Sequence, residues 1–213
     1  MELDKQRENR YTGKNRRGGK NRMMEQATAQ FMERLKEVSD GQNRCLIAID
    51  GRCGAGKTTL AEEIQKKIDC NVFHMDHFFL RPEQRTKERL MQPGGNIDHE
   101  RFLKEVLLPL KEGKTVCYRP YDCHLQDFRE EIRMEPKAIN LIEGSYSCHP
   151  ALWEQYDLRV FLSVSPEIQL QRIRRRNGEE GAKMFEERWI PLEERYFAQY
   201  ELEKRCDMVL DGR

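Results

Sequence analysis

Eight consecutive residues, from Gly51 to Thr58, have the types and the spacing of a phosphate-binding site. They read Gly-Arg-Cys-Gly-Ala-Gly-Lys-Thr and fit the pattern G-x-x-x-x-G-K-[ST]. Glycines let the backbone approach a phosphate closely, so that successive N–H groups can point at its oxygens. A lysine at this position reaches the β- and γ-phosphates of a nucleotide, and the threonine hydroxyl can bind Mg²⁺. The predicted nucleotide-binding residues are Gly51, Arg52, Cys53, Gly54, Ala55, Gly56, Lys57, Thr58 and Thr59.

The segments on either side of this loop have the patterns that such a site requires. Residues 45–49 form a short apolar run, which is typical of a strand buried on both faces. From Thr59 to Ile68, apolar residues recur at helical spacing opposite a charged face. Strand, loop and helix therefore follow in the order that the motif needs, and the positive end of the helix dipole adds to the attraction for phosphate.

Two carboxylates follow other strand-like segments. Residues 70–75 are predicted to form a strand that ends at Asp76, and residues 138–142 another that ends at Glu143. Open α/β sheets bind ligands at the carboxyl ends of their strands, so both acids can meet the loop there. We expect Glu143 to hold Mg²⁺, directly or through water. The alternatives are a helix cap or turn for Asp76 and a structural turn for Glu143.

Helical and strand-like patterns fill most of the remaining chain. Asp98 is expected to cap a helix that Gly113 ends, and Ser165 to cap another that ends at 177–178. The predicted further helices span 23–38, 98–112, 165–177 and 182–205, and the further strands 115–118, 158–162 and 208–210. Residues 81–97 are a long polar connection and a candidate binding loop. This alternation of strands and helices predicts an α/β domain.

Length and composition favour one cytoplasmic domain with a basic tail. The 213 residues suit a single α/β domain, which we place at 23–213, and the net charge of +1 does not suit a general polyanion binder. Residues 1–22 are basic and nearly free of apolar side chains, so we expect a disordered tail: either an arm for RNA or anionic surfaces, or a solvated extension. No apolar run is long enough for a signal segment or a membrane span. The seven scattered cysteines argue against a disulfide framework and a zinc site.

Several motifs, in this order and spacing, resemble those of the uridine kinase and phosphoribulokinase-like family of P-loop kinases. The resemblance covers residues 44–211 and rests on the loop and on five further segments. These are 75–79 (like Asp-Ser-Phe-Tyr), 96–99 (like Asn-Phe-Asp-His), 120–122, 142–144 and the arginine-bearing helix after Ser165. The resemblance implies the P-loop nucleoside-triphosphate hydrolase fold, with a mostly parallel sheet, helices on both faces and a small lid. It also implies transfer of the γ-phosphoryl group of ATP to a hydroxyl of a nucleoside or related small metabolite.

The resemblance also implies a role for each matching residue. Asp76 would be the base, and Lys57, Arg172 and Arg176 the other catalytic groups. Thr58 and Glu143 would hold Mg²⁺. The acceptor-binding residues would be Asp76, Phe79, Ile97, Asp98, Tyr121 and Gln126.

The sequence departs from the family pattern at two places. Cys123 and Gln126 stand where uridine kinases have an aromatic residue and a histidine. The lid lacks its second arginine, for which Lys183 or Arg188 is a candidate replacement. The acceptor and the oligomeric state stay open, a homo-oligomer included.

A second hypothesis is a nucleotide-binding regulatory or RNA-associated module that uses the basic tail. A guanine-specific switch is less favoured, because no Asn-Lys-x-Asp segment follows the loop.

Overall fold

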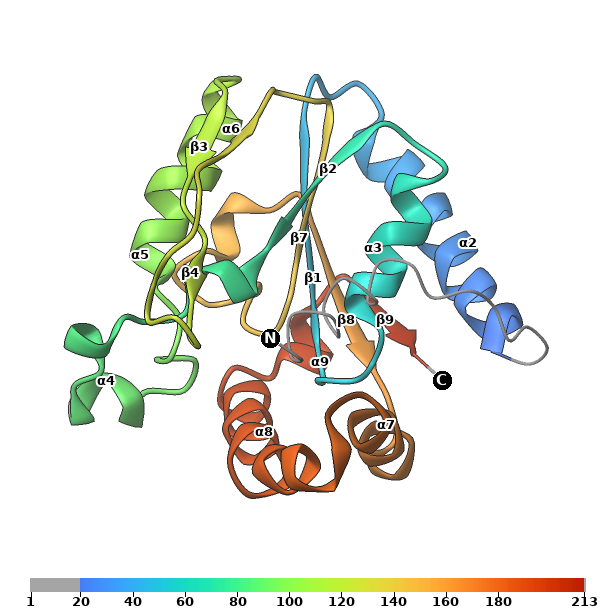
Figure 1. The fold of residues 1–213 in the computed structure, drawn as a ribbon. Coiled ribbons are helices and arrows are strands. Elements are labelled where there is room, and N and C mark those ends of the chain that lie inside the picture. Colours follow the sequence, from blue (N-terminus) through green and yellow to red (C-terminus); the bar gives the residue numbers. More distant parts are fainter. Residues whose placement is uncertain (1–19, 213) are drawn as a thin grey trace.

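The computed structural model describes residues 20–212, which fold around a parallel sheet of five strands in the order β2-β7-β1-β8-β9 (Figure 1). The strands are β1 (Cys45–Gly51), β2 (Cys70–His74), β7 (Ile139–Glu143), β8 (Leu158–Ser163) and β9 (Met208–Asp211). Every neighbouring pair is parallel. This confirms the predicted α/β fold and all five of the strands expected in its sheet.

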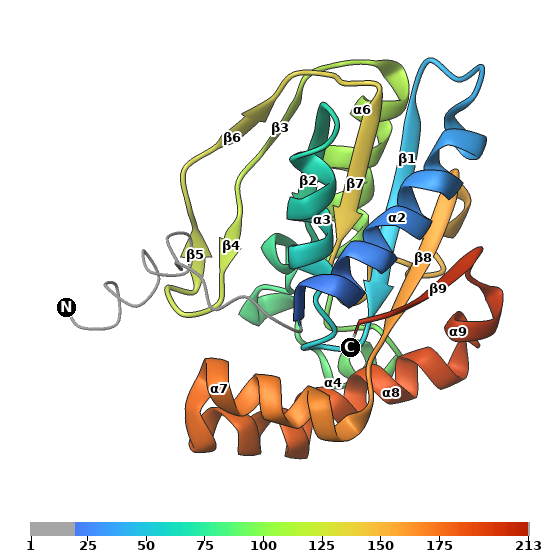
Figure 2. The same ribbon diagram turned by 90° about the vertical axis from the view of Figure 1, so that its right-hand side faces the viewer.

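The central strand β1 is buried throughout and apolar from Cys45 to Ile49, because both faces of the sheet are covered. Leu46 and Ala48 contribute to one hydrophobic core, and Ile47 and Ile49 to the other. Helices α2 (Lys20–Ser39) and α3 (Lys57–Gln65) cover one face, as Figure 2 shows in front view. The other face is covered by a helical stretch of three segments, α5 (His99–Phe102), η3 (Leu103–Leu107) and α6 (Leu108–Glu112).

This three-part helix begins and ends as predicted. The Asp98 carboxylate accepts the N–H of Arg101 at 3.0 Å, and Gly113 closes the helix with a left-handed φ of 69°. Its middle segment η3 is a π-helix that lies directly before Pro109. A proline cannot donate to the residue four positions earlier, so the turn before it widens. The same arrangement recurs in η5 (Phe185–Trp189), which precedes Pro191.

A second helical stretch, which we call the lid, crosses the carboxyl ends of the strands (Figures 1 and 2). It consists of α7 (Pro166–Met184), η5 and α8 (Ile190–Gln199). Ser165 caps α7, and Gly178 breaks it with a φ of 72°, both as predicted, but the helix resumes directly after the break. The single helix expected over 182–205 is wrong at its end. Left-handed Glu201 separates α8 from the short α9 (Leu202–Arg205).

Two small antiparallel pairs lie beside the sheet. β3 (Val116–Tyr118) pairs with β6 (Ile132–Met134), and β4 (Tyr121–Asp122) with β5 (Asp127–Phe128). Only the first of these four strands was predicted, since strands of two or three residues show no periodicity. The remaining short helices are η1 (Met75–Phe78), η2 (Pro82–Gln84), α4 (Lys87–Met91) and η4 (Trp153–Gln155).

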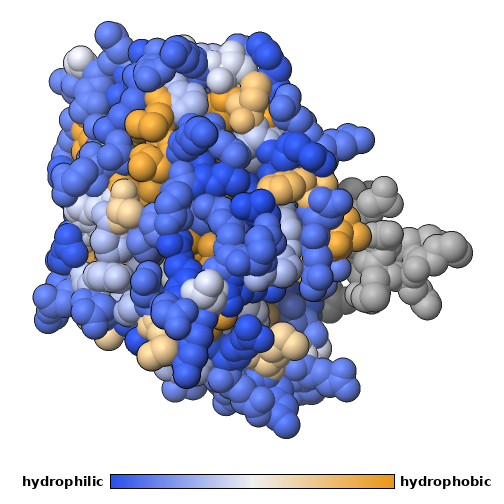
Figure 3. All heavy atoms as spheres, turned by 90° about the vertical axis from the view of Figure 1, so that its left-hand side faces the viewer, coloured by the Kyte–Doolittle hydropathy of each residue, from blue (hydrophilic) through white to orange (hydrophobic). Residues whose placement is uncertain are grey.

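On the side that carries α4 to α6, hydrophobic side chains form small separate groups on a mostly hydrophilic surface (Figure 3). Among residues 20–212, no helix combines the length and the apolar character needed to cross a membrane. Helix α2 begins at Lys20, three residues before its predicted start. The rest of the expected basic tail, residues 1–19, lies outside the described part of the chain.

Candidate functional site

The predicted phosphate-binding loop joins the end of β1 to the start of α3. Gly51 has a φ of 129°, and a Cβ atom there would lie 2.1 Å from the carbonyl oxygen of Leu162 in β8. Only glycine fits this close strand contact. The Lys57 ammonium donates to the carbonyls of Gly51 at 2.6 Å and Arg52 at 3.1 Å, so in this state it lies folded against its own loop.

The two predicted metal ligands lie together. The Thr58 hydroxyl donates to Oε1 of Glu143 at 3.2 Å. A hydroxyl and a carboxylate are both hard oxygen donors, the type that Mg²⁺ takes in nucleotide sites together with water and phosphate. This donor set fits Mg²⁺.

His74 is a neighbour of Glu143 that we did not predict. Its Nδ1 lies 2.6 Å from the same Oε1 atom that Thr58 contacts. Burial lowers the pKa of His74, but the hydrogen bond to Glu143 and the charge of that carboxylate outweigh it, so the pKa is raised. The contact with Glu143 therefore favours the protonated imidazole of His74 more than water does.

Asp76, the predicted base, belongs to η1 directly after β2. Desolvation and then the negative charge of Glu143 raise its pKa, whereas the positive charge of Lys57 lowers it. Its side chain is nonetheless exposed to solvent. Asp76 thus shares the carboxyl edge of the sheet with the loop lysine and with Glu143, and it is accessible to a small molecule.

Three predicted acceptor-binding residues come together beside Asp76. Phe79 and Ile97 form an antiparallel bridge, and the N–H of Asp98 donates to the carbonyl of Phe78 at 2.7 Å. The Asp98 carboxylate is buried and occupied: besides capping α5, it accepts Nε2 of Gln84 at 2.7 Å. The Asp98 carboxylate is therefore not free to bind an acceptor, whereas the Phe79 side chain is partly exposed.

Tyr121 and Gln126 lie on the β4–β5 hairpin, whose strand β4 packs on η1. Tyr121 is buried, and its hydroxyl has no hydrogen-bond partner within the described residues. Gln126 is exposed in the turn, with a left-handed φ of 53°. The structure therefore brings Tyr121 close to the segment of Asp76 and leaves Gln126 at the surface.

The two predicted lid arginines have other partners in this structure. Arg172 donates to the carbonyls of Gly54, Ala55 and Gly212 at 3.0, 3.2 and 2.6 Å, so it supports the loop from the lid side. Arg176 donates to Asn177 and lies 5.5 Å from the ring of Phe185. Both candidates for the missing second arginine of the lid have partners within the lid itself. Lys183 pairs with Glu187, and Arg188 lies over Trp189.

Asp50, the residue before the loop, anchors three segments of the site. Its carboxylate is fully buried and accepts N–H groups of Gly51, Tyr146 and Cys148 and the hydroxyl of Tyr196 in α8, at 2.7 to 3.1 Å. Desolvation raises its pKa to about 6, although these hydrogen bonds oppose the shift. No role was predicted for Asp50, which directly follows the apolar run 45–49.

Glu193 of α8 is the other site residue that sequence reasoning missed. It is 5% exposed and contacts the loop at Cys53. Its spacing to Tyr196 and Phe197, three and four residues on, places it on the buried stripe of α8, and this was the available signal.

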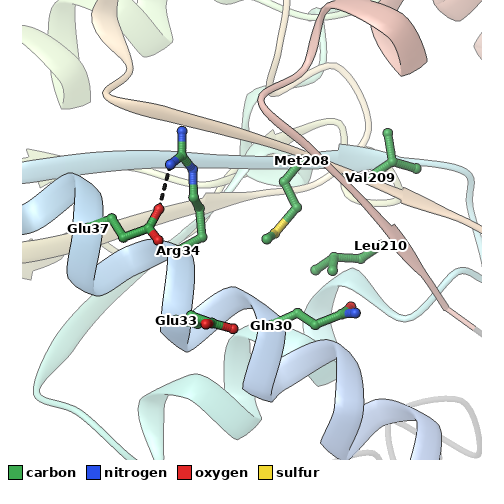
Figure 4. A pocket seen from close by; sticks show the side chains of 7 residues that line it. All are labelled: Gln30, Glu33, Arg34, Glu37, Met208, Val209 and Leu210. Atoms are coloured by element: carbon green, nitrogen blue, oxygen red, sulfur yellow. Dashed lines mark hydrogen bonds and ion pairs between the residues drawn. The ribbon is translucent and has the colours of Figure 1, made fainter.

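A groove between α2 and β9 lies outside this site (Figure 4). Its lining residues are Gln30, Glu33, Arg34, Glu37, Met208, Val209 and Leu210. None of them is a predicted site residue, and Arg34 is paired with Glu37 at 2.6 Å.

Comparison with known families identifies the protein family to which this phosphate-binding loop belongs. The model of the phosphoribulokinase/uridine kinase family matches residues 46–186, which is more than half of the chain. The chain belongs to this family. As a member, it is a P-loop kinase, and membership implies ATP at the loop and a small-molecule substrate.

Relatives of the phosphoribulokinase/uridine kinase family align over most of the chain. A uridine kinase of Staphylococcus haemolyticus is 27% identical over 154 residues, which cover 67% of this chain and 73% of the relative. A uridine kinase of Staphylococcus aureus is 26% identical over 151 residues, covering 65% and 72%.

Solved structures of similar proteins show the same fold. A possible uridine kinase from Bacillus stearothermophilus has a TM-score of 0.60 at 21% identity, covering 85% of this chain and 100% of that chain. A putative fructose transport system kinase from a Silicibacter species has a TM-score of 0.63 at 19% identity, covering 86% and 98%. At this identity the likeness concerns the fold alone.

Proposed function

We propose that this kinase transfers the γ-phosphoryl group of ATP to a hydroxyl of a nucleoside or a related small metabolite. One observation carries the proposal. Lys57, the Thr58–Glu143 pair and the accessible Asp76 share one edge of the sheet, where strands β1, β2 and β7 end. This is the set of groups that in-line phosphoryl transfer needs: a phosphate-binding cation, metal ligands and an acceptor for the hydroxyl proton.

Each residue has a distinct task in this proposal. Lys57 leaves the carbonyls of its loop and binds the β- and γ-phosphates, and Asp76 accepts the proton of the attacking hydroxyl. Thr58 and Glu143 hold Mg²⁺, which when bound neutralises charge on the phosphates. Arg172 and Arg176 serve as lid cations after they exchange their present partners for phosphate oxygens.

The relatives narrow the phosphoryl acceptor to a class of hydroxyl compounds and do not identify one compound. The names of the curated relatives point to uridine, whereas one solved neighbour is a putative kinase of a fructose transport system. Uridine and fructose both offer hydroxyl groups. Cys123 and Gln126 stand where uridine kinases read the base, and both are exposed here, so the acceptor need not be a pyrimidine nucleoside.

The test is a screen for ATP consumption with a panel of nucleosides and sugars, with and without Mg²⁺. We expect Mg²⁺-dependent ADP formation with at least one acceptor, and a phosphorylated product by mass spectrometry. Lys57→Ala protein, purified in the same way, controls for contaminating kinases. ATP binding without turnover on any acceptor would instead favour a regulatory nucleotide-binding module.

A further inference from the structure

A buried carboxylate from the lid lies against the phosphate-binding loop. Oε2 of Glu193 accepts the N–H of Cys53 at 2.9 Å, and Oε1 accepts the hydroxyl of Ser145 at 2.6 Å. Burying a carboxylate is costly unless its oxygens are hydrogen-bonded, and here each oxygen has a donor. Glu193 is therefore firmly seated in this state.

The contact extends to the loop lysine. The hydroxyl of Ser145 lies 3.3 Å from Nζ of Lys57, and it can accept from the ammonium while it donates to Glu193. Glu193 is thus one hydroxyl away from the ammonium that must reach the phosphates. Its negative charge also contributes to the raised pKa of Asp76, which places it on the reacting side of the loop.

The next residue makes a different contact. Glu194 pairs with the Arg52 guanidinium at 2.7 Å and is 42% exposed. Glu194 thus binds a side chain of the loop. Glu193 binds a backbone N–H of the loop and also Ser145, the hydrogen-bond partner of Lys57. The two adjacent glutamates therefore differ in role. Glu194 links α8 to the loop in general, whereas Glu193 places a charge inside the site.

We propose that Glu193 is a positioning residue that holds the loop and Lys57 in place when no γ-phosphate is bound, and that the γ-phosphate of ATP displaces it. The inference rests on the proposed function, because it needs ATP at the loop. The Glu193 carboxylate and the γ-phosphate would repel each other if both lay beside the Lys57 ammonium at the same end of the loop. ADP has no γ-phosphate and leaves Glu193 in place. Loading ATP thus frees α8 from the loop, and departure of the γ-phosphoryl group lets Glu193 return.

The test compares two nucleotides by calorimetry: ADP and a nonhydrolysable ATP analogue. Glu193→Gln keeps the shape but removes the charge, which weakens its hydrogen bonds and ends the repulsion. It should tighten binding of the analogue roughly tenfold while ADP binding changes little. Glu194→Gln, the matched control, should leave the ratio of the two affinities unchanged.

The outcomes separate the two proposals. An equal shift for both nucleotides, or weaker binding of the analogue, would show that Glu193 is merely structural. If the wild-type protein binds neither nucleotide, the proposed function fails and this inference fails with it.

A second variant covers the case in which Glu193→Gln does not fold. Ser145→Ala removes one donor of Glu193 and keeps the charge, so the affinity ratio should move in the same direction by about threefold. In the wild-type protein, the ATP analogue should also speed amide hydrogen exchange in residues 190–199, and ADP should not. Equal exchange with both nucleotides would overturn the proposal.

Discussion

The Thr58 hydroxyl and the Glu143 carboxylate lie 3.2 Å apart, although 85 positions separate them in the chain. Parallel pairing of β1 with β7 sets Ile49 opposite Glu143, so the loop that follows β1 passes directly over this carboxylate. The contact therefore depends on the register of the sheet and not on local sequence.

Changing Glu143 should alter the metal requirement. Glu143→Gln keeps the size of the side chain but removes the charge that attracts Mg²⁺, so the Mg²⁺ concentration for half-maximal activity should rise about tenfold or more. Excess metal should partly restore the rate. Glu63→Gln, on the exposed side of α3, serves as the control. An unchanged magnesium titration would contradict the assignment.

Changing Asp76 should affect the chemical step. Asp76→Asn removes the proton acceptor but keeps the shape, so kcat should fall by roughly two to four orders of magnitude while affinity for an ATP analogue with Mg²⁺ stays close to that of the wild type. Steady-state kinetics and calorimetry measure the two quantities. Loss of nucleotide affinity in place of kcat would assign the carboxylate to the metal. Asp69→Asn, at an exposed position, controls for general effects.

Removing the loop lysine should nearly abolish transfer. Lys57→Ala deletes the cation that faces the phosphates, and the rate should fall by roughly two to three orders of magnitude. The circular dichroism spectrum should stay the same, because the hydrogen bonds of the ammonium within residues 20–212 go to loop carbonyls and to Ser145. Lys67→Ala, at an exposed position in the turn after α3, is the matched control. Turnover near the wild-type rate would refute the site.

The buried Asp50 should make stability depend on pH. In the folded protein its pKa rises from 3.8 to about 6, so between these values the native state holds a proton that the unfolded chain has lost. The free energy of unfolding should therefore fall by roughly 3 kcal/mol as the pH rises from about 4 to about 6, and this contribution is complete only below pH 4. Urea unfolding of wild-type and Asp50→Asn protein at several pH values measures it. A constant difference between the two proteins would disprove the link.

Deleting residues 1–19 should leave ATP turnover unchanged, because this segment has few apolar side chains with which to contact the domain. The deletion should stop before Lys20, where α2 begins. Met24 lies 3.0 Å from the position of a Cβ atom on Gly56, so a longer deletion would disturb the loop itself. A tenfold loss of activity in the shorter deletion would assign the tail to the site.

The sheet was predictable from the sequence because most residues of its inner strands β7, β1 and β8 are buried. Residues 45–49 of β1 therefore appear as a continuous apolar run, and the glycine motif marks where β1 ends. The β4–β5 hairpin has two residues in each strand, which is too short for any pattern. The end of α8 was unpredictable for another reason. Glu201 adopts a left-handed φ of 49°, and a glutamate in a sequence does not indicate this uncommon conformation.

The site was predictable where a motif names its residues and not where tertiary contacts create it. Lys57, Thr58, Asp76 and Glu143 meet because they follow strand ends. Glu193 comes from a helix, where a glutamate is most often a solvated charge.

Arg172 donates to the carbonyl of Gly212 as well as to the loop, and the N–H of Gly212 donates to Ser163 in β8. Gly212 is therefore linked to the phosphate-binding loop through Arg172. A substitution at Gly212 would therefore reach the loop through Arg172, although Gly212 belongs to neither the loop nor the lid. Loss of the Gly212 carbonyl would remove one of the three carbonyl contacts of Arg172 and weaken its support of the loop without any change in the loop sequence.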